Sequence, residues 1–345
     1  MNSAANSGEF PPEVQRAIDL LLKDGCPDGS GYRRQLLLET IKLISEHPLR
    51  ADIKMMARAM AEIRQGLAMF APYADQRKVT LFGSARTAAD DPRYIQGKAV
   101  AAALVKAGFM IITGGGGGMM QAANEGAGEE HSFGININLP MEQAPNPVVA
   151  DSARHFYCQY FFTRKLFFLK ESSAVILTPG GFGTLDEGFE TLTLLQTGRN
   201  PPMPVIMLEA PGDDFWGPFL HSWIRRLTED GLIGAEDHRL LLHTDSVDAA
   251  VENIRSFYSN YHSFRYVGRW VLLRMLRPLS EASLARLNAE FSDVLASGSI
   301  EQVYGWPESD DEDTEALPRL RLQLDRHRMS VLPQSIRRMN ALATR

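Results

Sequence analysis

Residues 173–187 read SAVILTPGGFGTLDE, a short apolar stretch that runs into a glycine-rich turn and then into Thr184. A second stretch of the same kind, FMIITGGGGGMM, occupies residues 109–120. In each, a buried strand is expected to pass through glycines into a helix. Strands that alternate with helices pair in parallel and are covered on both faces. The two stretches therefore predict an α/β fold built on a parallel sheet with helices on both faces.

The same alternation extends outward from these two stretches. Further strands are predicted at 79–84, 133–139, 156–161 and 204–209, and helices at 91–108, 119–126, 164–172, 184–196 and from residues 214 and 247. Residues 1–74 are predicted to form an N-terminal helical extension, with a loop rich in glycine and aspartate at 24–31. The α/β domain is predicted to span 75–261.

The last part of the chain, 262–345, is predicted to be a small C-terminal α/β appendage. We expect a strand at 266–276, a helix at 279–297, strands at 300–304 and 318–326, and a helical tail. An acidic run lies within this appendage and is interpreted as a solvated loop; it contains Glu308, Asp310, Asp311, Glu312, Asp313 and Glu315.

Composition excludes several classes of protein. The chain has 345 residues, of which 44% are hydrophobic and 23% charged, which is typical of a globular protein rather than a disordered or fibrous one. Two cysteines cannot form a disulfide framework and favour a reducing compartment. The net charge of -6 argues against a protein that coats nucleic acid. Neither an export signal nor a membrane-spanning run is recognisable, so we expect a cytoplasmic protein without nucleic-acid or membrane partners.

The two glycine-rich turns are the strongest candidates for binding. Glycine lets the backbone approach a ligand closely, and the helix that follows offers unpaired N–H groups to an anion. Glycines also simply make tight strand–helix turns, and for one turn alone both interpretations have equal weight. The predicted phosphate- or nucleotide-binding residues of the turns are Gly115, Gly116, Gly118, Gly180, Gly181, Gly183 and Thr184.

Charged residues near these turns complete the candidate site. Glu187 lies one helical turn after Thr184, where a carboxylate suits a sugar or a water better than a phosphate. Arg164 and Lys165 are expected at a helix start, an unfavourable place for cations that suggests an anionic partner, although a solvent-facing pair is an equal alternative. Ser84 and Arg86 close the strand 79–84 and are also expected to reach the ligand.

Other familiar signatures are absent. Neither G-x-G-x-x-G with a ribose-binding acid nor G-x-x-x-x-G-K-[ST] occurs, which argues against NAD and ATP as ligands. No zinc signature and no G-x-S-x-G elbow is present. We therefore predict no metal and no cofactor.

The motif P-G-G-x-G-T-x-x-E at 179–187, with FGSAR, TGGGGGMMQAANEGA, GININLPMEQAPNP and YFFTRK upstream, resembles the Lonely Guy (LOG) family. The resemblance covers roughly residues 78–260. It implies a Rossmann-like fold, at least a homodimer, and hydrolysis of the N-glycosidic bond of a purine nucleoside 5′-monophosphate, with AMP as the default substrate. By motif position, Arg164 and Glu187 match the catalytic pair of the family, and the second turn matches its phosphate loop. Many relatives have Pro and Glu where this chain has Gly117 and Gln121.

Two alternatives remain at this point. The first is a nucleotide- or cofactor-binding carrier or sensor on the same fold that does not catalyse hydrolysis, because fold alone does not determine function. The second is a pyridoxal-phosphate decarboxylase, the old name of the family, which needs a Schiff-base lysine such as Lys165 or Lys170.

Overall fold

The computed structural model describes residues 11–22, 31–46, 49–139, 144–305 and 314–343. The chain divides into two compact units, Met1–Ala61 and Glu62–Arg345. The first contains α1 (Pro12–Leu22), α2 (Tyr32–Glu46) and the beginning of α3 (Arg50–Phe70). Within it, α1 and α2 are joined by an ion pair between Arg34 and Asp19. Most of the predicted loop at 24–31 and of the acidic run at 308–315 lies outside the described residues.

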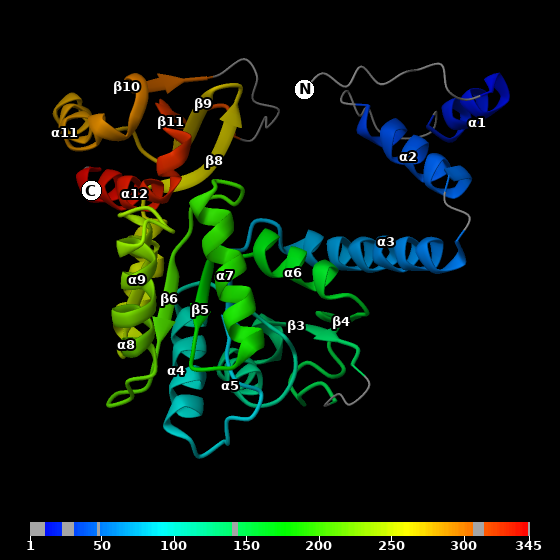
Figure 1. The fold of residues 1–345 in the computed structure, drawn as a ribbon, viewed down its shortest axis with the longest axis horizontal. Coiled ribbons are helices and arrows are strands. Elements are labelled where there is room, and N and C mark those ends of the chain that lie inside the picture. Colours follow the sequence, from blue (N-terminus) through cyan, green and yellow to red (C-terminus); the bar gives the residue numbers. More distant parts are fainter. Residues whose placement is uncertain (1–10, 23–30, 47–48, 140–143, 306–313, 344–345) are drawn as a thin grey trace. The chain divides into compact units, whose positions relative to one another are not determined.

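The second unit is built on a seven-stranded parallel sheet in the order β4-β3-β2-β1-β5-β6-β7, shown in Figure 1. The sheet confirms the predicted α/β fold with a parallel sheet and flanking helices. Its strands are β1 (Lys78–Phe82), β2 (Met110–Thr113), β3 (Ser132–Ile137), β4 (His155–Cys158), β5 (Ala174–Leu177), β6 (Val205–Leu208) and β7 (Leu241–Thr244). The strand order changes direction at β1, which pairs with β2 on one side and β5 on the other.

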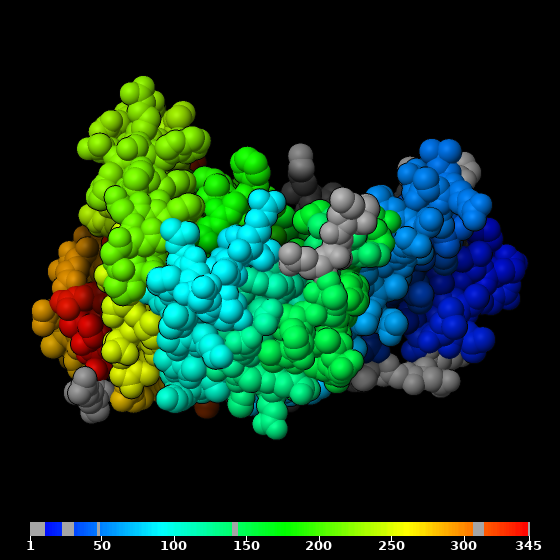
Figure 2. All heavy atoms as spheres, turned by 90° about the horizontal axis from the view of Figure 1, so that it is seen from below, coloured from blue at the N-terminus to red at the C-terminus, as the bar shows by residue number. Residues whose placement is uncertain are grey.

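Helices cover both faces of this sheet. α4 (Pro92–Lys106), α5 (Met119–Ala127) and α10 (Val247–Phe257) pack on one face, and Figure 2 shows α4 in cyan beside the yellow atoms of α10. The end of α3, α6 (Phe161–Lys170) and α7 (Phe182–Gln196) pack on the other. Between β6 and β7 the chain forms α8 (Trp216–Pro218), the π-helical segment η3 (Phe219–Ile224) and α9 (Arg225–Glu229).

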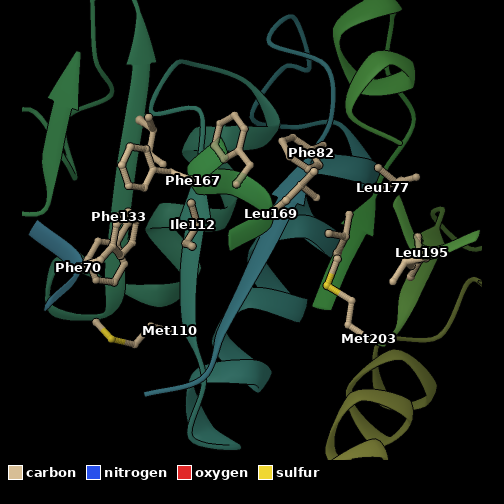
Figure 3. Packing of buried hydrophobic residues seen from close by; sticks show 14 of the residues in the cluster. Phe70, Phe82, Met110, Ile112, Phe133, Phe167, Leu169, Leu177, Leu195 and Met203 are labelled. Carbon is tan, nitrogen blue, oxygen red and sulfur yellow. The ribbon is translucent and has the colours of Figure 1, made fainter. Parts of the chain in front are cut away.

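Side chains of one strand alternate between the two cores. On β5, Ala174 and Ile176 belong to the core under α4, whereas Val175 and Leu177 belong to the core under α6 and α7. Residues two apart point to the same face of a strand, so a strand buried on both faces must be apolar throughout. Figure 3 shows the second core, where the rings of Phe70 and Phe133 stack with centroids 4.6 Å apart.

The C-terminal part forms a four-stranded antiparallel sheet in the order β10-β11-β9-β8. Its strands are β8 (Tyr261–Val267), β9 (Trp270–Met275), β10 (Leu295–Tyr304) and β11 (Pro318–Leu324), and its helices are α11 (Glu281–Phe291) and α12 (Leu332–Leu342). The single strand predicted at 266–276 is wrong, because Gly268, at φ +59°, turns the chain and makes a hairpin. The helix predicted to reach residue 297 ends at Phe291, and β10 starts at Leu295.

Other elements also differ from the prediction. β7 was not predicted, because it is a four-residue edge strand whose side chains are at least partly exposed. α6 begins at Phe161 and α7 at Phe182, each before the residue expected. Among the described residues, none of the helices has the length and apolar character needed to cross a membrane.

The core on the α6 side offers a test of the packing. Phe167 is fully buried, and its ring lies 5.9 Å from Phe70 and 5.7 Å from Phe156. We expect Phe167→Ala to lower the free energy of unfolding by about 3–5 kcal/mol, because it removes buried contacts and leaves a cavity. Urea denaturation measures this loss. Leu166→Ala, on the 43% exposed neighbour, is the control and should cost less than about 1 kcal/mol. Equal losses would contradict the assigned packing.

Candidate active site

The candidate site lies at the carboxyl ends of β1 and β5, where the strand order reverses. Open α/β sheets bind ligands at such points, because the loops from neighbouring strands diverge there. A cavity of about 640 Å³ occupies this position. It is lined by residues 82–86, Gly114, Met120, Phe161, Arg164, Phe168 and residues 181–187. All of these residues lie between Phe82 and Glu187 in the sequence.

The loop after β1 is fixed against both glycine-rich turns. The Ser84 amide donates to the Pro179 carbonyl at 3.3 Å, and the Met119 amide donates to the Ser84 carbonyl at 2.9 Å. Gly118, at φ +61°, brings the first turn so close that a Cβ there would lie 2.5 Å from the Ser84 oxygen. Ser84 and Arg86 thereby reach the cavity, as predicted from the sequence.

The first glycine-rich turn is held by a buried polar network. Thr113 Oγ1 donates to Asn124 Oδ1 at 2.8 Å and accepts from the Gly115 amide at 3.0 Å. Asn146 donates from its side chain to the same Asn124 oxygen and to the Gly116 carbonyl. Asn124 therefore holds the loop, whereas Gln121 donates to Glu125 at 2.9 Å.

The glycines of this first turn are explained largely by packing. A Cβ on Gly115 would lie 1.9 Å from Asn136 Oδ1, and one on Gly116 would lie 2.8 Å from Met120 Cε. Gly115, Gly116 and Gly118 do not line the cavity described above, but Gly114 does. A Cβ on Gly114 would lie 2.1 Å from an Arg164 nitrogen. This turn therefore shapes the wall and leaves room for the arginine.

The second turn is open where the first is packed. Thr184 is buried, and a Cβ on Gly180 would lie 2.2 Å from the Thr184 hydroxyl oxygen. By contrast, a Cβ on Gly181 or Gly183 would meet no described atom within 4 Å, and neither residue has positive φ. No side chain caps α7 at Gly181, so the first N–H groups of the helix are available to an anion. The fold itself does not require glycine at these two positions.

Helix α6 supplies the opposite wall. Arg164 is the fourth residue of the helix, and its Nε donates to the Ile135 carbonyl at 2.8 Å. Its guanidinium lies 5.0 Å from the centre of the Phe168 ring. Phe161, Arg164 and Phe168 are three and four residues apart, so they share one helical face toward the cavity. Aromatic rings and one guanidinium thus line the same wall.

Glu187 is the buried acid of the site. Its residue is 6% exposed, and its Oε2 makes no hydrogen bond to a described group. Burial raises the pKa of Glu187 to about 7, although the positive charges of Lys165 and Arg164 lower it in part. A carboxyl group with this pKa changes protonation near neutral pH and suits general acid or base catalysis.

Lys165 faces α7 rather than the cavity. Its Nζ lies 2.8 Å from both Asp186 Oδ2 and Glu190 Oε2, and 3.9 Å from Glu187 Oε2. Burial lowers the pKa of Lys165, but hydrogen bonds to Asp186 and Glu190 raise it above its ordinary value overall. The lysine predicted to bind phosphate is thus an ion-pair partner that links α6 to α7.

The structure therefore brings most of the predicted residues together. Ser84, Arg86, Arg164, Gly181, Gly183, Thr184 and Glu187 line one cavity. Lys165 and Gly180 do not line it, and neither do the three glycines of the first turn named above. Sequence reasoning missed Gly114, Met120, Phe161 and Phe168. The helical spacing from Arg164 identifies the two phenylalanines. No three His, Cys, Asp or Glu side chains gather as a metal site within the described ranges.

Comparison with known proteins gives matches in the α/β part of the chain. Residues 117–254 match the family model described as "Possible lysine decarboxylase". The chain is 28% identical over 121 residues to a cytokinin riboside 5′-monophosphate phosphoribohydrolase of Arabidopsis thaliana. It is 31% identical over 98 residues to one of Oryza sativa subsp. japonica.

In this region the chain resembles the Lonely Guy family. The two Lonely Guy matches cover 35% and 28% of this chain and only 55% and 39% of the relatives, about half of their length. Among solved structures, a molybdenum cofactor binding protein of Rippkaea orientalis aligns over 52% of this chain and 94% of its own. Its sequence identity is 20% and its TM-score is 0.36.

Ionisation of Glu187 has a consequence for stability. Because its pKa rises from 4.5 to about 7 on folding, the protonated form is favoured in the folded state. Its contribution to stability is intact below pH 4.5 and is lost as the pH rises to about 7. We expect the free energy of unfolding of Glu187→Gln, relative to the native chain, to increase by about 3 kcal/mol between pH 4.5 and pH 8. Denaturant unfolding across this range measures the difference, and a constant value would contradict the buried ionisable carboxyl.

Proposed function

We propose that the protein hydrolyses the N-glycosidic bond of a purine nucleoside 5′-monophosphate and releases the free base and ribose 5-phosphate. AMP is the default substrate, and prenylated adenine nucleotides of the cytokinin type belong to the same class. The observation that carries the proposal is the buried Glu187 beside the open start of α7 in one cavity. The phosphoribohydrolase names of the curated relatives support it.

In this proposal the phosphate occupies the start of α7. The unpaired N–H groups there, together with the Thr184 hydroxyl, stabilise its negative charge. Gly181 and Gly183 leave open space that a phosphate would fill, since a Cβ there meets no described protein atom. Binding the phosphate, which does not react, supplies energy to position the reacting bond.

Glu187 and Arg164 act on the ribose and the departing base. Cleavage of a glycosidic bond develops positive charge on the sugar ring, which an ionised Glu187 stabilises. The same carboxylate orients the attacking water or the ribose hydroxyls and takes up a proton. Arg164, held by the Ile135 carbonyl, orients the substrate, and the Phe168 ring beside it offers an apolar surface to the base.

The residues do not fit pyridoxal-phosphate chemistry. A Schiff base requires a lysine with an available neutral amine inside the cavity. No lysine lines the cavity in the described part of the chain, and Lys165 is held by the carboxylates of α7. Lys170 pairs with Glu171 at 2.6 Å. We therefore assign no decarboxylase function.

We also propose that the protein acts as a homodimer or larger homo-oligomer in the cytoplasm. Phe161 and Phe162 are both more than half exposed on α6, which suits a surface covered by a second copy.

Replacement of the buried acid tests the chemistry. We expect Glu187→Gln to lower turnover of a nucleoside 5′-monophosphate by at least about 100-fold while nucleotide binding persists, because only the proton-accepting group is lost. Chromatography of the released base and calorimetry of binding measure the two effects. Glu190→Gln is the matched control, since Glu190 also pairs with Lys165 but does not line the cavity. Binding without release of base from any nucleotide, even by the native chain, would instead identify a carrier or sensor.

The open turn gives a second test. We expect Gly183→Ala to raise the KM for the nucleotide about tenfold or more, because the new methyl group would occupy the space in which we place the phosphate. Its melting temperature should stay equal or increase, since alanine favours helix over glycine. In the control Gly188→Ala, the new Cβ lies 2.9 Å from Leu177 Cδ1, so stability should fall while KM is retained. An unchanged KM for Gly183→Ala would exclude this phosphate position.

A further inference from the structure

A second cavity lies at the other end of α7. It has a volume of about 570 Å³ and is formed by residues 197–201 after the helix, by β8 with its turn, and by η7 (Arg326–Val331). Figure 1 shows that α7 extends to the C-terminal sheet at β8. α7 has 15 residues, so about 22 Å separates its two ends. The second cavity is therefore distinct from the one that contains Glu187.

The charged residues that line this second cavity in the described part of the chain are all arginines. Arg199, Arg265 and Arg326 contribute to its wall, and no aspartate or glutamate is found among its described lining residues. This local excess of positive charge stands in a chain of net charge -6. A protein needs a specific arrangement of side chains to create a positive pocket against its own net charge.

Neighbouring arginines of the same sheet and loop are compensated. Arg328 lies 2.8 Å from Glu236 and 3.0 Å from Asp293. By contrast, Arg199 and Arg326 form no ion pair within the described ranges of the chain. Two carboxylates therefore pair with Arg328, just outside the cavity, whereas none among the described residues pairs with Arg199 or Arg326.

Tyr266 lies close to both Arg199 and Arg326. Gly198, at φ +65°, holds the chain so close to β8 that a Cβ would lie 2.4 Å from the Tyr266 hydroxyl. Burial raises the pKa of Tyr266, and the charges of Arg326 and Arg199 lower it in part, which places both guanidiniums near the hydroxyl. The rings of Phe264 and Tyr266 pack edge to face at 4.8 Å beside them.

We propose that the second cavity binds a small anion that carries adjacent phosphate groups. Guanidinium groups recognise phosphate through paired, charge-assisted hydrogen bonds, and those of Arg199 and Arg326 together suit more than one phosphate charge. The half-exposed ring of Tyr266 provides a surface on which a nucleobase can stack. The shared chemistry is a diphosphate, either inorganic or attached to a nucleoside.

Calorimetry with inorganic pyrophosphate on the full chain tests the site. We expect saturable binding that weakens with added salt and whose dissociation constant rises at least tenfold in Arg199→Ala/Arg326→Ala. The matched control is Arg225→Ala/Arg226→Ala, which removes the same charge from exposed positions on α9 and should bind within twofold of the native chain. Gly183→Ala, which alters the first cavity, should also bind pyrophosphate normally.

The outcomes separate the possible sites. Absence of saturable binding, or equal binding by the Arg199→Ala/Arg326→Ala variant and the native chain, would overturn the proposal. Loss of binding in Gly183→Ala would place pyrophosphate in the first cavity and overturn it equally. Repeating the titration with ADP in the Gly183→Ala variant distinguishes the sources. Tighter binding than pyrophosphate indicates a nucleoside diphosphate, and equal binding indicates recognition of phosphate alone. Neither result depends on the hydrolytic function proposed for Glu187.

Discussion

The parallel pairing of β1 with β5 is the constraint on which the site depends. Val79 to Phe82 align with Ala174 to Leu177, and the Thr178 amide continues the ladder to the Phe82 carbonyl at 2.8 Å. Both strands therefore end at the same level. Beyond that level, the segment after β1 leads to α4 and the segment after β5 leads into α7. The two loops separate around the cavity. Without this register, Ser84 and Thr184 would not face the same space.

That geometry also buries an acidic side chain, although burial destabilises its ionised form. Glu187 lies on the buried side of α7, where its Oε2 has no hydrogen-bond partner in the described structure. Lys165 offsets part of this cost, but Asp186 and Glu190 hold it more closely than Glu187 does. A fold optimised only for stability would bring the ammonium to the buried acid. The arrangement instead leaves a carboxyl that can gain and lose a proton, as functional sites do at the expense of stability.

The sequence predicted the parallel sheet because its strands are short apolar runs followed by glycine or helix signals. β7 was not predicted, because its sequence LLHT is short and partly exposed. The β8–β9 hairpin was not predicted, because only Gly268 interrupts a run of residues that otherwise has the pattern of one strand. Motif spacing indicated Arg164 and Glu187, which the structure places in one cavity. Spacing did not reveal that Lys165 pairs across to α7, since that contact depends on how two helices pack.

The position of β1 in the sheet also governs the order in which the fold is assembled. During synthesis β1 is made first, and β2, β3 and β4 extend the sheet from only one of its edges. Its other edge belongs to a strand that is buried at every residue in the folded protein, and it stays unpaired until β5, which starts at Ala174, is made. Unpaired strand edges attract other chains. The nascent protein therefore carries its central strand as an exposed edge until β5, which pairs with it and leads into the loop that lines the cavity, leaves the ribosome.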